Sequence, residues 1–141
     1  SVTMVGSAQE NQVLTANTAT LADADGLGAI SFQWQRDGVN VAGATGTTYT
    51  LGNADVGHSI DVVAKYTDGH GTLESVDSAA TATATNVNDP PTGSVTMVGS
   101  AQENQVLTAN TSTLADADGL GAISLQWQRD GVNVAGAPGP T

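Results

Sequence analysis

The chain contains no cysteine, which excludes disulfide bonds and thiolate metal sites. Basic side chains are almost as scarce: Arg36, Lys65 and Arg129 stand against 14 acidic residues, and the formal net charge is −11. Such a surface repels nucleic acid and anionic lipid but attracts cations. No apolar run approaches the roughly 20 residues of a membrane span. We therefore expect no nucleic-acid partner and no direct insertion into a membrane.

Long charged side chains of either sign are also few, since charged residues make up 12% of the sequence. Thr, Ala, Val, Ser and 17 glycines take their place. This composition favours strands and turns over helices. Acidity alone is equally compatible with a surface that only maintains solubility. A cation site therefore needs support from the positions of the acids as well as from their number.

The sequence repeats itself. Residues 94–141 align with residues 1–48 without gaps, and because Ser94 repeats Ser1 the period is 93 residues. The copies differ at four positions: Ala19/Ser112, Phe32/Leu125, Thr45/Pro138 and Thr47/Pro140. A period of this length is a whole domain rather than one turn of a solenoid. We predict a complete repeat at residues 1–93, including a linker at 86–93, and the N-terminal half of a second repeat at 94–141.

Alternating apolar and polar residues predict a series of short strands in the first repeat, at the spacing typical of a β-sandwich. Asp37–Gly38 is a two-residue hairpin signal, and Trp34 supplies a large core side chain in the third strand. We predict an all-β, immunoglobulin-like antiparallel β-sandwich of seven strands, with another antiparallel sandwich or barrel as the alternative. The expected strands cover residues 2–5, 12–18, 30–35, 39–42, 47–51, 60–66 and 73–85.

Oxygen-bearing side chains gather where one repeat ends and the next begins. Strands of a sandwich run alternately up and down, so successive loops fall at alternate ends. This alternation places Glu10 and Asp55 at the end from which the linker emerges, and it turns the Asp-x-Asp loop of the second repeat toward that linker. The predicted ligands are Glu10, Asp55, Asn86, Asn88, Asp89, Asp116 and Asp118. Hard oxygen donors from three segments fit Ca²⁺, which takes roughly 6–8 oxygens in flexible geometry.

The opposite end of the first repeat carries a second set of acids: Asp23, Asp25 and Asp68. We expect them to form an open site that faces a preceding repeat. The Asp23 loop is no EF-hand, because Trp34 occupies the position where that loop has its glutamate. His58 and His70 are isolated in turns and are expected to be solvent-exposed rather than metal ligands. No nucleophile or phosphate-binding motif is present, so we expect no enzymatic activity.

The motifs at residues 10–12, 21–28, 33–38, 66–69 and 86–91 resemble the tandem immunoglobulin-like extender repeats of giant bacterial RTX-type surface adhesins. The joint is also similar to cadherin linkers, in which a glutamate, an Asp-x-Asp pair and an Asn/Asp-rich linker hold calcium. Only Asp55 is a counterpart of the acidic corner motif of cadherins, which leaves the number of ions per joint open. The resemblance implies an extracellular stalk on a bacterial cell surface, stiffened by Ca²⁺, whose partners are neighbouring repeats of the same protein.

Two functions stay open on the sequence alone: a structural spacer, and a binding module that recognises a glycan or a surface. The few aromatic residues all fit core positions, which favours the spacer. The chain begins inside a repeat without a signal peptide, so we expect a fragment of a longer protein. Half a sandwich has open edges and half a core. Residues 94–141 are therefore expected to be either a truncation or a half completed by strands from another chain.

Overall fold

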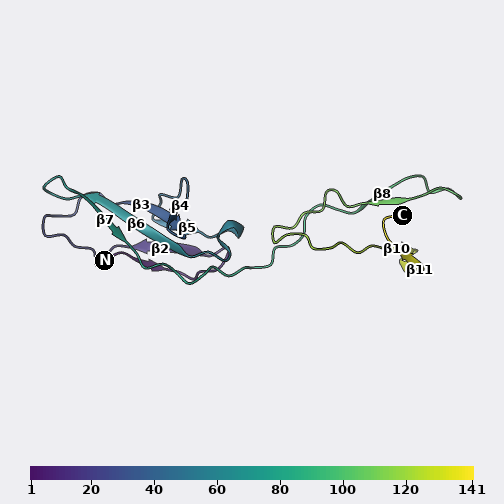
Figure 1. Ribbon diagram of the computed structural model, residues 1–141, viewed down its shortest axis with the longest axis horizontal. Coiled ribbons are helices and arrows are strands. Elements are labelled where there is room, and N and C mark those ends of the chain that lie inside the picture. Colours follow the sequence, from purple (N-terminus) through teal and green to yellow (C-terminus); the bar gives the residue numbers. More distant parts are fainter. The chain divides into compact units, whose positions relative to one another are not determined.

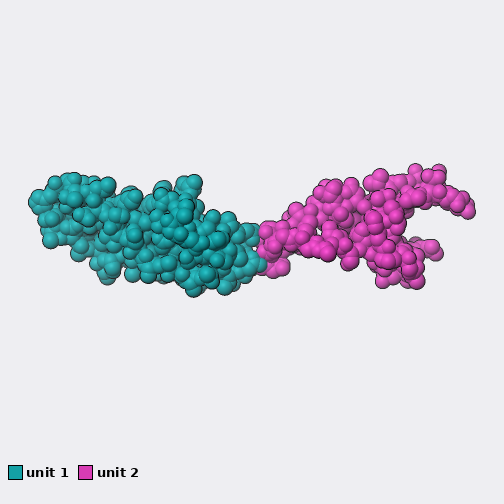
Figure 2. All heavy atoms as spheres, in the orientation of Figure 1, with its two compact units in different colours: residues 1–87 teal, residues 88–141 magenta.

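The computed structural model describes residues 1–141 and consists of strands with one short 3₁₀ turn (Figure 1). The chain divides into two compact units, Ser1–Val87 and Asn88–Thr141, which Figure 2 colours separately. This division assigns linker residues 88–93 to the second unit. Every strand pair in the sheets is antiparallel. The predicted all-β, antiparallel class is confirmed.

Unit 1 contains a three-stranded sheet of order β1-β2-β5 and a four-stranded sheet of order β4-β3-β6-β7. Its elements are β1 (Thr3–Val5), β2 (Val13–Asn17), β3 (Ser31–Arg36), β4 (Val39–Asn40), β5 (Thr48–Thr50), η1 (Asn53–Asp55), β6 (Ile60–Thr67) and β7 (Leu73–Asp77). The first six predicted strands are present, with ends that differ by one or two residues. Alternation of apolar and polar residues was sufficient to find most of them because these strands turn one face toward the core, whereas both residues of β4 are exposed and the strand was found from the Asp37–Gly38 hairpin signal.

A single hydrophobic core draws on both sheets. Leu14 of β2, Trp34 of β3 and Ile60 of β6 are each 0% exposed. The Trp34 ring stacks on Tyr49 of β5, with ring centroids 5.6 Å apart and planes inclined by 24°. These contacts join the two sheets face to face, so the unit is β-sandwich-like.

The last predicted strand is wrong in its length: β7 ends at Asp77 rather than at residue 85. Beyond Asp77, the Val62 backbone N–H donates to Ser78 Oγ, and the Ile60 N–H donates to Thr81 Oγ1, both at 3.0 Å. Side-chain hydroxyls thus replace the carbonyls that a continuing strand would offer to β6, while the Ser78 and Thr81 N–H groups still donate to the Val62 and Ile60 carbonyls at 3.0 Å and 2.9 Å. A run of alternating Ser, Thr and Ala favours extended backbone, but the hydroxyls end the regular strand pairing at Asp77 although the segment stays bonded to β6.

Unit 2 contains two separate strand pairs. β8 (Thr96–Val98) pairs with β9 (Thr108–Asn110), and β10 (Gln126–Arg129) pairs with β11 (Val132–Pro138). The β8–β9 register, from Thr96↔Asn110 to Val98↔Thr108, is the β1–β2 register moved by one 93-residue period. No residue of unit 2 is buried. The same local pairing therefore occurs in unit 2 without a closed core.

Replacing Ile60 by alanine should lower the free energy of unfolding of unit 1 by about 2–5 kcal/mol, because the change leaves a cavity in a fully enclosed site. Chemical denaturation followed by circular dichroism measures this loss. The control is Val132→Ala, at a side chain that is 69% exposed. It should shift stability by no more than about 0.5 kcal/mol. Equal effects of the two variants would contradict the assigned core.

Candidate metal centre

Glu10 is a carboxylate held in place at the end of unit 1. The residue is only 2% exposed. Its backbone N–H donates to the Thr85 carbonyl at 2.9 Å, and its Oε2 accepts the Val87 N–H at 3.1 Å. Asn11, which follows, has a φ of 64°, a left-handed conformation that asparagine tolerates better than most residues. The sharp turn and these bonds tie the Glu10 loop to the last residue of the unit.

Residues 84–87, the segment that reaches Glu10, are held by contacts with two other parts of unit 1. Thr85 forms an isolated parallel bridge with Gln9, and Ala84 forms another with Val56. The Thr85 N–H donates to the Ala8 carbonyl at 3.0 Å. The chain therefore leaves unit 1 beside Glu10, as the alternation of loops predicts.

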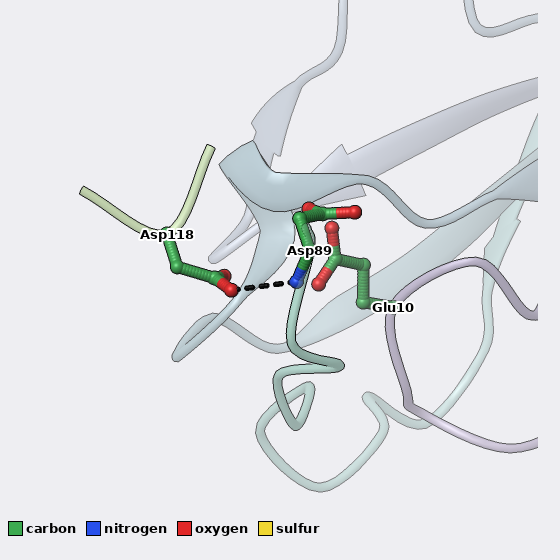
Figure 3. Close-up of side chains that lie close together, drawn as sticks. All are labelled: Glu10, Asp89 and Asp118. Atoms are coloured by element: carbon green, nitrogen blue, oxygen red, sulfur yellow. Dashed lines mark hydrogen bonds between the residues drawn. The ribbon is translucent and has the colours of Figure 1, made fainter. Parts of the chain in front are cut away.

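Asp89 and Asp118 are in contact within unit 2. The Asp89 backbone N–H donates to Asp118 Oδ2 at 2.7 Å, the bond that is dashed in Figure 3. The Asp118 N–H donates in turn to Asp116 Oδ1 at 2.9 Å. An antiparallel bridge between Thr92 and Ala115 holds the linker alongside this loop. Two of the predicted ligand segments, the linker and the Asp-x-Asp loop, are thus brought together inside unit 2.

The remaining linker amides are solvent-facing. Asn86 and Asn88 are both exposed. Asn88 Nδ2 donates to the carbonyl of Asp89 at 3.1 Å. This bond uses the amide nitrogen of Asn88 and does not involve its side-chain oxygen. Amide oxygens at these positions can act as additional neutral ligands for a hard cation.

Asp55 is enclosed by donors of its own unit. Its Oδ1 lies 2.6 Å from Arg36 Nη2, and its Oδ2 accepts the Gly52 N–H at 2.8 Å. The Tyr49 hydroxyl lies 2.9 Å and 3.0 Å from the two oxygens. The hydrogen bond to Asp55 raises the pKa of Arg36, and burial, aided by Asp55, raises the pKa of Tyr49. Because both Asp55 oxygens already accept hydrogen bonds, its role as an ion ligand stays a prediction and is not part of the site proposed below.

The acids predicted at the other end of unit 1 also have local partners. Asp23 Oδ2 accepts the Tyr66 hydroxyl at 2.8 Å, and this bond is the main reason that the Tyr66 pKa is raised to about 12. Asp25 Oδ1 lies 3.3 Å from His70 Nδ1. Asp68 Oδ1 accepts the N–H groups of His70 and Thr72 at 2.9 Å and 2.7 Å. The Thr72 N–H is the first cause of the lowered Asp68 pKa.

Asp23, Asp25 and Asp68 do not converge into one group of potential ligands. Their oxygens order the two loops instead, through a hydroxyl, backbone N–H groups and an imidazole. The open site at this end stays a prediction. The sequence signal for its local bonds is present in retrospect, since Asp-x-Asp-Gly and Asp-Gly-x-Gly are typical of turns closed by the aspartate side chain.

Sequence reasoning missed a partnership between Asp37 and His58. Asp37 Oδ2 lies 2.5 Å from His58 Nδ1, and its Oδ1 accepts the Ser59 N–H at 2.9 Å. The bond to His58, followed by those to Ser59, lowers the Asp37 pKa from 3.8 to about 2. Both histidines are exposed, as expected, but each pairs with a carboxylate. The contact joins the β3–β4 hairpin to the start of β6, and sequence spacing does not reveal it.

A scan of protein-family models and searches of curated proteins and solved structures found no match to this chain. No helix in the structure is long and apolar enough to cross a membrane. A functional proposal therefore rests on the chemistry of the residues themselves.

The Asp37 pKa predicts a loss of stability in acid. A folded-state pKa below the unfolded value stabilises the fold above the unfolded pKa, and this contribution disappears as pH falls from 3.8 through about 2. Asp37→Asn should therefore flatten the pH dependence of unfolding in this window. Asparagine tolerates the φ of 47° at this position, so the turn is retained.

Asp130→Asn is the matched control for Asp37→Asn, because Asp130 occupies the same turn in unit 2 with a φ of 49°. Urea denaturation at a series of acidic pH values measures both variants. The control should keep the wild-type slope of stability against pH. An unchanged slope in Asp37→Asn would contradict the assignment.

Proposed function

We propose that this protein is a structural spacer of a bacterial cell-surface adhesin, in which Ca²⁺ bound between consecutive repeats stiffens an extracellular stalk. The observation that carries the proposal is a short series of bonds along the chain. Glu10 accepts the Val87 N–H, and Asp89, two residues later, donates its own N–H to Asp118. Covalent continuity alone therefore keeps the linker acid near a carboxylate of each repeat.

The proposed ligands are Glu10 of unit 1 and Asp89 and Asp118 of unit 2, which all carry hard carboxylate oxygens. Three carboxylates that share one site would repel one another unless a cation offset their charge. Ca²⁺ suits them because every donor is a hard oxygen, and its larger coordination number admits further ligands. Asn86, Asn88 and Asp116 are proposed as further sources of such oxygens, together with backbone carbonyls and water.

The architecture supports a spacer of immunoglobulin-like repeats. Sheets of order β1-β2-β5 and β4-β3-β6-β7, with Trp34 of the third strand in the core, correspond to the two-sheet pattern of that fold. The 93-residue sequence period and the shared register of β1–β2 and β8–β9 support a tandem arrangement. In such an array, the ion sites fall at the joints, and each joint uses residues from two neighbouring repeats.

A glycan- or surface-binding module has less support. None of the five aromatic side chains is fully exposed, since Trp34 and Tyr66 are buried and the other three are half-buried, which gives little support to the flat aromatic platforms typical of carbohydrate contacts. Most of the acidic residues lie in loops and in the linker, and only Asp61, Glu74 and Asp77 lie in strands, in β6 and β7. These positions fit a joint better than a recognition surface.

Ca²⁺ should raise the melting temperature of the full chain relative to EDTA, because an ion that binds only the folded state stabilises it. Glu10→Gln and Asp118→Asn should each weaken Ca²⁺ affinity in calorimetric titration by roughly tenfold or more, since even residues that only hydrogen-bond to a metal ligand contribute about 10- to 100-fold.

The repeat supplies matched controls for these variants. Glu103 copies Glu10 and Asp25 copies Asp118, but neither belongs to the proposed site at the joint. Glu103→Gln and Asp25→Asn should retain the wild-type affinity of that joint site. The site would be disproved if Ca²⁺ produced no thermal shift or if the control variants lost as much affinity as the ligand variants.

Bound Ca²⁺ should also lengthen the particle in small-angle X-ray scattering, since a linker tied at both ends samples fewer bent arrangements. The maximum dimension should be larger in Ca²⁺ than in EDTA, and Asp118→Asn should remove the difference while Asp25→Asn keeps it. A Ca²⁺-bound chain with the same dimensions as the chelated chain would leave binding intact but refute the stiffening role.

A further inference from the structure

The turn that follows β9 carries a motif that the proposed ion site does not use. Asn110, Thr111 and Ser112 form Asn-x-Ser with a residue other than proline in the middle, which is the acceptor sequence for N-linked sugars. No other asparagine in this sequence is followed two positions later by serine or threonine. Short motifs of this kind also occur by chance, so the geometry of the turn decides whether this one is usable.

The turn presents the motif to solvent. Asn110 is the last residue of β9, where it pairs with Thr96 of β8, and it is exposed. The Ser112 backbone N–H donates to Asn110 Oδ1 at 2.9 Å, which fixes the orientation of the carboxamide. The Leu114 N–H donates to the Thr111 carbonyl at 3.0 Å and closes the turn behind the motif. The motif therefore lies in an ordered turn at the surface of unit 2, where a bulky sugar meets no packing obstacle.

The two side-chain groups that N-linked glycosylation uses are free of bonds within the protein. Asn110 Nδ2, the nitrogen that would carry the sugar, donates to no protein group. Ser112 Oγ likewise makes no hydrogen bond within the protein, and Ser112 is exposed. Neither packing nor hydrogen bonding thus gives the Ser112 hydroxyl a structural role. A transferase can contact both groups without breaking any internal bond.

Unit 1 contains the same turn without the hydroxyl. Asn17 is the last residue of β2 and is exposed, and its Oδ1 accepts the Ala19 N–H at 2.9 Å. The Leu21 N–H donates to the Thr18 carbonyl at 2.9 Å, as at the corresponding residues of unit 2. Alanine therefore supports this turn as well as serine does. The two copies differ within the motif only in the hydroxyl of Ser112.

We propose that Asn110 is a glycosylation site, which accepts an N-linked sugar from a donor activated through a phosphate ester at its anomeric carbon. In the transfer, Asn110 Nδ2 attacks the anomeric carbon, forms the new carbon–nitrogen bond and loses one proton to a base of the transferase. The bond between that carbon and the phosphate oxygen breaks, and the phosphate leaves with the electron pair. The Ser112 hydroxyl is the group by which the transferase distinguishes this turn from the turn at Asn17. The site is independent of the proposed ion site, because neither Asn110 nor Ser112 is a proposed ligand.

Peptide mapping by mass spectrometry tests this assignment on the folded full chain. The chain is incubated with UDP-glucose and a soluble N-glycosyltransferase that recognises Asn-x-Ser/Thr, and it is then digested. One hexose should be added to the peptide that contains Asn110 and none to the peptide that contains Asn17. A synthetic peptide of residues 108–114 shows that the enzyme is active. Modification of that peptide without modification of Asn110 in the chain would overturn the proposal.

Reciprocal variants test the role of the hydroxyl. Ser112→Ala should abolish the modification of Asn110, and Ser112→Thr should retain it. The turn at Asn17 shows that alanine keeps the bond to the asparagine side chain, so a loss in Ser112→Ala would not reflect a lost turn. Ala19→Ser should create a second acceptor at Asn17. A hexose that persists in Ser112→Ala, or an Asn17 that stays unmodified in Ala19→Ser, would contradict recognition through this hydroxyl.

The same mapping, applied to the chain isolated from the cells that produce it, tests whether the site is used. The peptide that contains Asn110 should carry a sugar, and the peptide that contains Asn17 should not. An unmodified Asn110 in the natural chain would overturn its assignment as a glycosylation site.

Discussion

The contact between residues 84–87 and the loop at residues 8–10 is the constraint on which both the fold and the proposed site depend. Thr85 accepts the Glu10 N–H and donates to Ala8, which attaches the end of the chain segment to the beginning of the unit. The same contact places the Val87 N–H on the Glu10 carboxylate. Closure of the hydrophobic core and positioning of the first proposed ligand are therefore one structural event. A chain that failed to close here would lose the ligand geometry together with the core.

The acidic composition has two distinct structural uses. Asp23, Asp37, Asp55 and Asp68 each accept hydrogen bonds from hydroxyl, imidazole, guanidinium or backbone donors inside unit 1. Those bonds order turns and need no ion. The proposed ion site uses acids at the junction of linker and repeat, where the basic side chains of this chain are too few to offset their charge. Net charge alone does not separate these uses, whereas the donors around each carboxylate do.

The sequence predicts most of the strands and the Trp34 core because burial of one face leaves a visible alternation. It also brings Glu10, the linker and the Asp116–Asp118 loop into one hypothesis, because strand direction decides the end at which each loop lies. Sequence reasoning fails where a single side-chain atom decides where a strand ends or which partner a carboxylate binds. The hydroxyls of Ser78 and Thr81 end the last strand early, and Asp55 turns to Arg36, 19 residues away in the sequence. Loop alternation gives the end of the sandwich but not the direction of a carboxylate.

The parallel bridge between Gln9 and Thr85 has a mechanical consequence for any stalk that carries load. Tension in such a stalk would act on unit 1 near Ser1 and near Val87, and the loop that follows β1 runs parallel beside the last segment of the unit. Pulling the ends apart slides the loop at residues 8–10 and the segment at residues 84–87 along their length, so the hydrogen bonds at Ala8, Glu10 and Val87 are strained together rather than opened one after another. These residues next to the linker therefore resist force in shear, in addition to the β1–β2 pairing near Ser1.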